Sequence, residues 1–180
     1  MKKTEYEVRV LEIDQEKLKE KLEKLGAIKQ GDYNQKRYTY NFTPIQRGKW
    51  VRLRTDGTKT TLAIKDIQSK EIDGTKELEV EVSDFETTNE ILNDLGYQVN
   101  NYQENKRITY ELNGVEIDID HWPLIPPYVE IEGNSEEEVL DTLKDLGLDN
   151  GKVTTLDPMG VYKEIYGIDI SNKPILKFED

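Results

Sequence analysis

The sequence predicts an α+β fold in which antiparallel strands outnumber helices. Eight segments alternate between apolar and polar residues, as half-buried strands do, whereas only a few segments have helical spacing. Turn dipeptides separate several of the alternating segments, and such dipeptides indicate β-hairpins. These turns are Asp56-Gly57, Asp73-Gly74 and Asn113-Gly114. Hairpins joined in this way favour an antiparallel sheet or barrel over a parallel βαβ sheet.

The individual elements follow from capping residues and periodicity. Asp14 is a good N-cap for the first helix, Ser135 opens a capping box before the third, and Pro158 suits the first turn of a short fourth helix. A glycine follows each of the first three helices. The predicted helices span residues 14–25, 88–95, 135–146 and 158–166. The predicted strands span residues 4–12, 35–42, 49–55, 60–66, 76–83, 105–112, 115–121 and 128–132.

Composition limits the class of protein. The chain has 180 residues, so a single domain over 1–180 is expected, with a polar and loosely ordered tail at 169–180. A net charge of -12 argues against a general binder of nucleic acid or of a membrane surface, since both attract basic faces. Cysteine is absent and His121 is the single histidine, which excludes thiolate chemistry and makes a histidine-based metal site improbable. No apolar leader or long apolar run is present, so we expect a cytoplasmic protein.

The two halves of the chain share a weak internal echo. The pairs Leu25-Gly26 and Lys36-Arg37 recur at one constant offset as Leu95-Gly96 and Lys106-Arg107. We interpret each half as a strand, a helix that ends in Leu-Gly, and a strand with a basic pair. Chance recurrence of common residue types is the alternative.

Six predicted strands carry charged residues on one face and aliphatic residues on the other. In the N-terminal stretch KTEYEVRV, Glu5, Glu7 and Arg9 alternate with one tyrosine and two valines. Several of the other faces hold only acids or only bases. The further charged positions are Arg52, Arg54, Lys65, Glu77, Glu79, Glu81, Glu116, Asp118, Asp120, Glu130 and Glu132.

Two structures account for such faces. The commoner one is a sheet whose charged face lies in water. The other is a closed barrel with the charges inside and the apolar face outside, where helices cover it. Like charges two residues apart on one face repel each other, and a bound partner of opposite charge would relieve that repulsion. The recurrence of the pattern in six strands favours the barrel.

A barrel that holds both signs of charge is suited to one class of ligand. Carboxylates bind hard cations such as Mg²⁺ or Mn²⁺ through oxygen, and Arg and Lys bind phosphate oxygens. A phosphate ligand alone would not need so many acids, and a metal alone would not need so many bases. The combination predicts a metal–polyphosphate site.

The same residues, in order, resemble a known family. Glu5-x-Glu7-x-Arg9 at the N-terminus is similar to the Glu-x-Glu-x-Lys signature of the CYTH, or triphosphate tunnel metalloenzyme, superfamily. That superfamily includes class IV adenylyl cyclases, thiamine triphosphatases, inorganic triphosphatases and fungal-type RNA triphosphatases. The resemblance continues through VRLR, LAIK, ELEVEV, KRITY, EIDID and YVEIEG, and so spans nearly the whole chain.

The resemblance implies an eight-stranded antiparallel β-barrel that forms a tunnel, with helices packed outside. It implies a triphosphate-bearing substrate and a divalent metal, Mg²⁺ or Mn²⁺. The implied metal ligands are Glu5, Glu7, Glu130 and Glu132, assisted by Asp118 or Asp120, with Glu77 and Glu79 as further tunnel acids. The implied phosphate-binding residues are Arg9, Arg52, Arg54, Lys65, Lys106 and Arg107, with Lys163 closing the tunnel from the last helix.

Three departures from the family pattern stand out. Arg9 replaces the signature lysine, and because arginine does not deprotonate in proteins, it is expected to bind phosphate and not to act as a base. Asn105 stands where the family often has a lysine two residues before Arg107, so one cation is missing there. The segment WPLIPP at 122–127 replaces the usual Leu-Gly turn and predicts a rigid connection.

Hydrolysis of a triphosphate is the first functional prediction, with Lys65 and Arg9 as candidate catalytic residues and either a carboxylate or Lys65 as the base. A class IV adenylyl cyclase is the alternative, and it would need a wall for adenine. A non-catalytic nucleotide or polyphosphate binder is a third possibility, and a purely structural acidic domain is a fourth. No nucleic-acid or membrane partner is expected, and a homodimer is one expectation for the oligomeric state. Candidates for the adenine wall are Tyr38, Tyr40, Trp50, His121 and Trp122.

Overall fold

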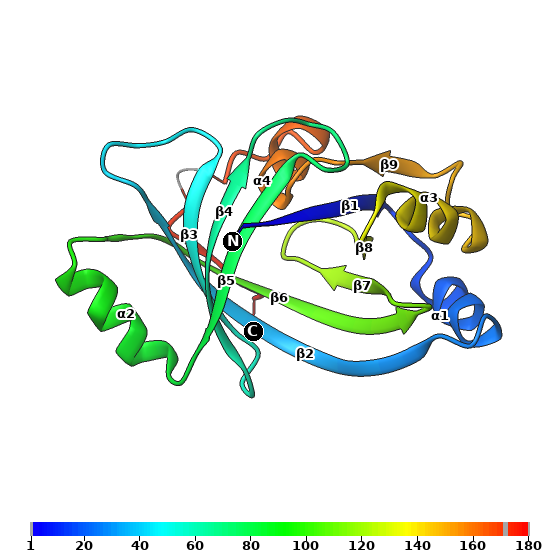
Figure 1. Ribbon diagram of the computed structural model, residues 1–180, viewed down its shortest axis with the longest axis horizontal. Helices are drawn as coiled ribbons and strands as arrows, with labels where there is room; N and C mark the ends of the chain where they lie inside the picture. The colour runs from blue at the N-terminus through cyan, green and yellow to red at the C-terminus, as the bar shows by residue number, and fades with distance from the viewer. Residues whose placement is uncertain (1, 171–172, 180) are drawn as a thin grey trace.

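The computed structural model describes residues 2–170 and 173–179, and within them eight antiparallel strands close into a barrel (Figure 1). The ring runs β1-β5-β4-β3-β2-β6-β7-β8 and returns to β1. The predicted eight-stranded α+β barrel is therefore confirmed. The ring strands are β1 Lys3–Leu11, β2 Ile28–Asn41, β3 Lys49–Thr55, β4 Thr60–Ile67, β5 Thr75–Val82, β6 Val99–Leu112, β7 Val115–His121 and β8 Tyr128–Gly133.

Two short strands lie outside the ring. β9 (Lys152–Thr154) pairs with β1, and β10 (Ile175–Leu176) runs parallel to β6. The pairing of β1 with β5 covers only the first residues of β1, and further along Glu7 N donates to Ile72 O at 3.1 Å. The loop before β5 therefore completes the ring where the two strands separate.

The longest strand pair exceeds what alternation predicted. β2 and β6 begin at Ile28 and Val99, several residues before the predicted starts at 35 and 105. The early part of β2 is rich in Gln, Asn, Asp and Gly, which have low strand propensity, and a register shift lies between Lys29 and Gly31. Pairing with β6 along its whole length outweighs the low strand propensity of these residues.

Four helices of the described chain pack outside the ring: α1 (Gln15–Lys24), α2 (Phe85–Asp94), α3 (Glu136–Asp145) and the short α4 (Pro158–Gly160), which continues as a π-helical turn at Val161–Ile165. α2 begins three residues before the prediction because Asp84 is its cap and accepts a hydrogen bond from Thr87 N at 2.7 Å. α1 and α3 lie at one end of the molecule and α2 at the other (Figure 1).

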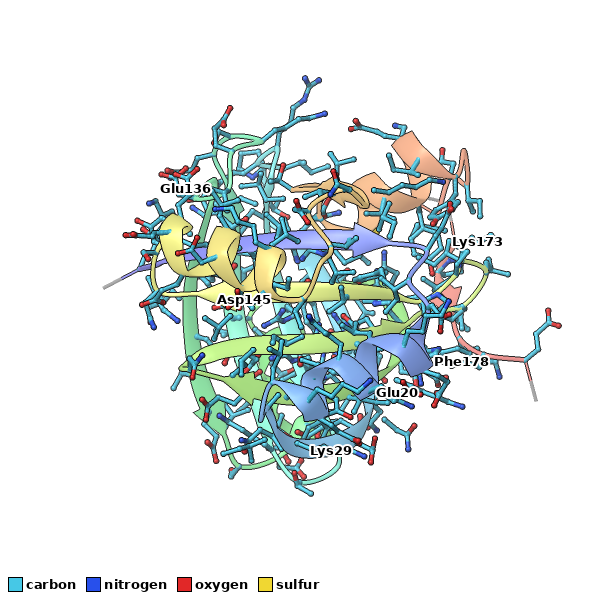
Figure 2. All side chains as sticks on the ribbon, turned by 90° about the vertical axis from the view of Figure 1, so that its right-hand side faces the viewer. Glu20, Lys29, Glu136, Asp145, Lys173 and Phe178 are labelled. Atoms are coloured by element: carbon cyan, nitrogen blue, oxygen red, sulfur yellow. The ribbon has the colours of Figure 1, made fainter. Side chains whose placement is uncertain are left out.

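The hydrophobic core lies outside the barrel wall, so the reading of a sheet with a wet charged face is excluded. Figure 2 shows α1 and α3 in front of the strands, and their leucines and Val139 pack on the outward valines of β1 and the isoleucines of β7 and β8. A second cluster packs α2 on β2 and β3 through Tyr40, Leu53 and Phe85. Each such buried side chain stabilises the fold by about 1.5–3 kcal/mol.

The third cluster anchors the C-terminal part of the chain. Trp122, Tyr162 and Leu176 are buried together, so this part of the tail packs on the barrel. Of the predicted tail, 171, 172 and 180 lie outside the described residues. No helix in the described ranges is long and apolar enough to cross a lipid bilayer.

Candidate functional site

A cavity of about 730 Å³ lies inside the barrel, and each of the eight ring strands contributes a charged side chain to its lining. Its size is within the roughly 300–1,000 Å³ of small-molecule sites. The alternation noted in the sequence places the charges here because alternate residues of a strand share one face. The predicted site residues that line the cavity are Glu5, Glu7, Arg9, Arg52, Arg54, Lys65, Glu77, Glu79, Arg107, Glu130 and Glu132.

One side of the cavity is acidic. Glu5 and Glu7 on β1 and Glu130 and Glu132 on β8 form what we call the acid wall. Glu7 lies directly opposite Glu132, and the next strand adds Glu116 beside Glu132. Three glutamates from three adjacent strands therefore lie in register at one level of the barrel.

The other side is basic. Arg37 on β2, Arg52 and Arg54 on β3, and Arg107 on β6 form the arginine cluster. Arg37 lies directly opposite Arg54. The charge of Arg52, burial and the charge of Arg107 lower the pKa of Arg54 to about 10. β2 is four strands from β1 in either direction around the ring, so Arg37 stands across the barrel from β1, whereas Arg107 reaches the acid wall, with its Nη2 3.3 Å from Glu130 Oε1.

Lys65 lies between Glu5 of the acid wall and Glu77, which pairs with Arg52 of the arginine cluster. Its Nζ lies 2.8 Å from Oε2 of Glu5 and 3.4 Å from Oε2 of Glu77. Burial, followed by a hydrogen bond to Glu77, raises the pKa of Glu5 to about 9. Glu77 itself stays ionised, because the hydrogen bond from Glu5 and the charge of Arg52 outweigh burial and lower its pKa. The two carboxyl groups therefore hold one proton between them.

Arg9 is fixed at the centre of the acid wall. Its Nη2 donates to Glu7 Oε2 at 3.1 Å and forms an ion pair with Glu130, and its Nη1 donates to the carbonyl O of Leu156 at 2.9 Å. Burial disfavours its charge, but Glu130 and Glu7 outweigh burial and hold the pKa of Arg9 above its usual value. Arg9 is thus a permanent cation that also ties the chain after β9 to the barrel.

Asp118 and Asp120 lie on the inner face of β7 but do not line the cavity. Arg107 covers both, and its Nε donates to Asp120 Oδ1 at 2.9 Å. Thr109 Oγ1 donates to Asp118 Oδ1 at 2.6 Å, and Asn105 Nδ2 donates to Asp120 Oδ1 at 3.0 Å. These two aspartates therefore hold Arg107 in place, and binding a metal would require them to leave it.

Two predicted phosphate-binding residues lie outside the cavity. Lys106 is exposed and its Nζ sits 4.9 Å from the centre of the Phe178 ring. Neighbouring residues on a strand point to opposite faces, so Lys106 faces outward because Arg107 faces inward. Lys163 is exposed on the π-helical turn and does not close the tunnel, whereas its neighbour Tyr162 is buried against Trp122.

Of the five candidate aromatic residues, two line the cavity: Trp50 and Trp122. Tyr38 stacks on Phe85 outside the barrel, with 5.0 Å between the centres of the two aromatic rings. The three that do not line the cavity are Tyr38, Tyr40 and His121.

Sequence reasoning missed Arg37 as a cavity residue, and it placed Glu116 on a charged inner face without assigning it a role. Arg37 supplies, from the neighbouring strand, the cation that the family pattern lacks at Asn105, and its Nη2 donates to the Asn105 side-chain oxygen. Two signals were present for Arg37: its basic pair echoes Lys106-Arg107, and Tyr38 and Tyr40 mark the outward face of β2.

The acid wall has the donor set of a hard divalent cation. Among the described residues no three acidic or histidine side chains converge on one ligand point, because the chain's own cations occupy their oxygens. The pKa of Glu132 is nevertheless raised by burial and by the charges of Glu130 and Glu7. Glu132 pairs with Lys3 at 3.5 Å but also faces the like charges of Glu130 and Glu7, and a bound Mg²⁺ or Mn²⁺ would relieve their repulsion.

Comparisons with known proteins agree with this geometry. A family model described as the CYTH domain matches residues 2–155. Comparison with curated protein sequences gave no match. Among solved structures, the PH1012 protein of Pyrococcus horikoshii OT3 is 27% identical, with a TM-score of 0.74 over 85% of this chain and 96% of its own.

Two further solved structures share the fold at lower identity. A candidate adenylate cyclase from Vibrio parahaemolyticus is 15% identical, with a TM-score of 0.75 over 93% of this chain and 99% of its own. A candidate adenylyl cyclase from Hippeastrum, described as having a dominant triphosphatase activity, is 14% identical, with a TM-score of 0.60 over 91% of this chain and 96% of its own. At these identities the likeness extends to the fold alone.

Proposed function

The chain belongs to the CYTH domain family, and we propose that it is a divalent-metal-dependent triphosphatase that hydrolyses a triphosphate inside the barrel. The observation that carries the proposal is the opposition of the acid wall to the arginine cluster across one cavity. In this proposal a triphosphate contacts both, with a metal ion at its acidic end and arginines at the other. The Hippeastrum protein's described activity is consistent with this choice.

The arginine cluster and Lys65 would bind and align the phosphates. Arg52 is held for this role by Glu77 and Glu79, at 2.8 and 2.9 Å from its Nη2, and Arg107 is held by its two aspartates. Guanidinium groups fixed in this way form charge-assisted bonds to phosphate oxygens without reorganising. A bound Mg²⁺ or Mn²⁺ would supply further neutralisation of the phosphate charge.

The proton acceptor would be a carboxylate. Burial and Arg52 disfavour the charge on Lys65, but Glu7, Glu5 and Glu77 outweigh them and raise its pKa. Arg9 is a permanent cation for the same reason. Since neither residue releases its proton, we assign both to charge stabilisation and the activation of water to a glutamate of the acid wall.

Cyclisation of ATP to cyclic AMP is the second candidate. Trp50 lines the cavity and offers an aromatic face for a base, whereas Arg37 lies over the ring of Trp122. Asn101 and Gln103 add neutral amide groups to the same lining. A cyclase would use the same acid wall and arginine cluster and would differ in the attacking group.

The test is product analysis with purified protein. Tripolyphosphate and ATP are incubated separately with Mg²⁺ or Mn²⁺, and phosphate, pyrophosphate and cyclic AMP are followed. The proposal expects phosphate from tripolyphosphate, abolished by chelation and in Glu5→Gln/Glu7→Gln but retained in Glu20→Gln/Glu23→Gln, which removes two exposed acids of α1. Cyclic AMP and pyrophosphate from ATP would establish the cyclase instead. Metal-dependent binding without either product would leave a non-catalytic binder.

A further inference from the structure

Arg37 differs from every other basic residue of the arginine cluster in having no acidic partner. Arg52, Arg54 and Arg107 each form an ion pair with a carboxylate, whereas Arg37 forms none within the described residues. Its hydrogen bonds go to two neutral amide oxygens: Nη2 donates to Gln35 Oε1 at 3.1 Å and to the side-chain oxygen of Asn105. Its Nε is buried and has no hydrogen-bond partner among the residues that the structure describes.

The surroundings of Arg37 leave its positive charge uncompensated. The side chain is only 6% exposed, and burial together with Arg54, Arg52 and Arg107 lowers its pKa. The charge of Asp120 raises the pKa of Arg37, but the oxygens of Asp120 already accept hydrogen bonds from Arg107 and Asn105. An arginine does not lose its proton, so a buried guanidinium in this position is stabilised by an anion.

The orientation of Arg37 is also fixed. Its guanidinium lies over the ring of Trp122, with Cζ 4.6 Å from the ring centre. Trp122 is in turn held edge-to-face by Tyr162, at 6.4 Å between ring centres. Both hydrogen bonds leave from Nη2 and Nε is buried, so Nη1 is the nitrogen that remains for a ligand in the cavity. A cation held in this way loses little conformational freedom when it binds.

We propose that Arg37 makes the site selective for polyphosphate length. Arg37 is on β2 and the acid wall is on β1 and β8, so they stand on opposite sides of the ring. A tripolyphosphate held at the acid wall extends to Arg37, and its most distant phosphate supplies the missing anion. A pyrophosphate held at the same wall is shorter and leaves Arg37 unpaired. The inference rests on the proposed function in that the ligand is a triphosphate.

The test is calorimetric binding of non-hydrolysable analogues, imidotriphosphate and imidodiphosphate, in the presence of Mg²⁺. Arg37→Gln is expected to weaken the binding of imidotriphosphate by about 10- to 100-fold, the loss typical of a charge-assisted bond, and of imidodiphosphate by less than about threefold. Lys106→Gln is the matched control, because it removes an exposed cation from the outer face of β6. It is expected to leave both affinities unchanged.

An equal loss for both analogues, or no loss for either, would overturn the inference. Thermal unfolding shows whether Arg37→Gln is folded. If it is not, Arg37→Lys decides, since it keeps the charge and loses the planar fork: an imidotriphosphate-selective loss of about threefold or more supports the inference, and unchanged affinities refute it. A wild-type protein that binds the analogues but releases no phosphate from tripolyphosphate refutes the triphosphatase and leaves the length selectivity standing. A wild-type protein that binds neither analogue refutes the inference as well.

Discussion

Lys65 Nζ lies 2.8 Å from Oε2 and 3.0 Å from Oε1 of Glu5, so a residue expected to bind phosphate and a residue expected to bind metal are hydrogen-bonded to each other. Arg9, expected to bind phosphate, is likewise paired with Glu130, expected to bind metal. Loading the acid wall with a metal ion would release Lys65 from Glu5 and make its charge available to phosphate. Metal and substrate binding are therefore expected to reinforce each other.

Replacement of Lys65 tests its role on the substrate. Lys65→Gln is expected to lower kcat for tripolyphosphate by about 100-fold or more, because a fixed cation at the reacting phosphates is lost. Lys65→Arg keeps the charge and should retain more activity. Lys24→Gln, an exposed change on α1, is the control. Steady-state phosphate release measures the effect, and an unchanged kcat in Lys65→Gln would remove Lys65 from the mechanism.

The pKa of Glu5 makes a prediction about stability and pH. Because the folded pKa is about 9 and the usual value is 4.5, the folded protein retains a proton that the unfolded chain releases within this window. The free energy of unfolding should therefore fall as the pH rises through it, with a slope of up to about 1.4 kcal/mol per pH unit. Urea denaturation in chelator should show this slope in the wild type and a flatter one in Glu5→Gln. Equal slopes would contradict the assignment.

Restoring the signature lysine at position 9 should weaken the fold. Arg9→Lys replaces a planar group that contacts Glu7, Glu130 and the carbonyl O of Leu156 by a single ammonium that cannot reach all three. One buried acceptor is left unpaired, at a cost of about 1–3 kcal/mol. Urea denaturation measures the loss. A variant as stable as the wild type would show that these contacts contribute little.

Asp120 should act through Arg107. Asp120→Asn removes the charge that holds this guanidinium, and we expect KM for tripolyphosphate to rise about tenfold, or about 1.4 kcal/mol, with a smaller change in kcat. In an Arg107→Gln background the same substitution should have little effect on KM, since the residue that it positions is absent. Additive effects of the two changes would argue for a separate role of Asp120.

Metal binding should stabilise the folded protein independently of turnover. Mg²⁺ at about 100 times its dissociation constant is expected to add about 2.7 kcal/mol to the free energy of unfolding. Glu132→Gln should lose most of this gain, because Glu132 faces the like charges of Glu130 and Glu7. Tm with and without Mg²⁺ measures it. A full Mg²⁺ effect in Glu132→Gln would place the ion elsewhere.

Alternation predicted the charged faces of the site well, because a strand of period two fixes which residues share a side. Glu5, Glu7 and Arg9 all line the cavity as expected. Alternation does not by itself say which side is inside, and that is why Lys106 was included and Arg37 was not. What decides the inner side is that the barrel turns its apolar residues outward. Tyr40, for example, faces outward and is covered by α2.

Other differences come from tertiary context. The start of β2 has poor strand propensity and is formed by pairing with β6, which no local pattern shows. The family resemblance implied that Asp118 or Asp120 would assist in binding the metal. In the structure both aspartates pair with Arg107. Whether a carboxylate pairs with a side chain or is left for an ion depends on the strand register, which the sequence does not give.

The pairing of Glu7 with Glu132 also bears on how the protein is made. β1 is the first strand of the ring to be synthesised and β8 is the last, so the carboxylates that face each other can come together only after every ring strand has been made. Contacts between such distant parts of a chain form slowly. An interrupted chain that stops before β8 would therefore lack half of the acid wall, and closure of the ring would be the step that brings the facing carboxylates together.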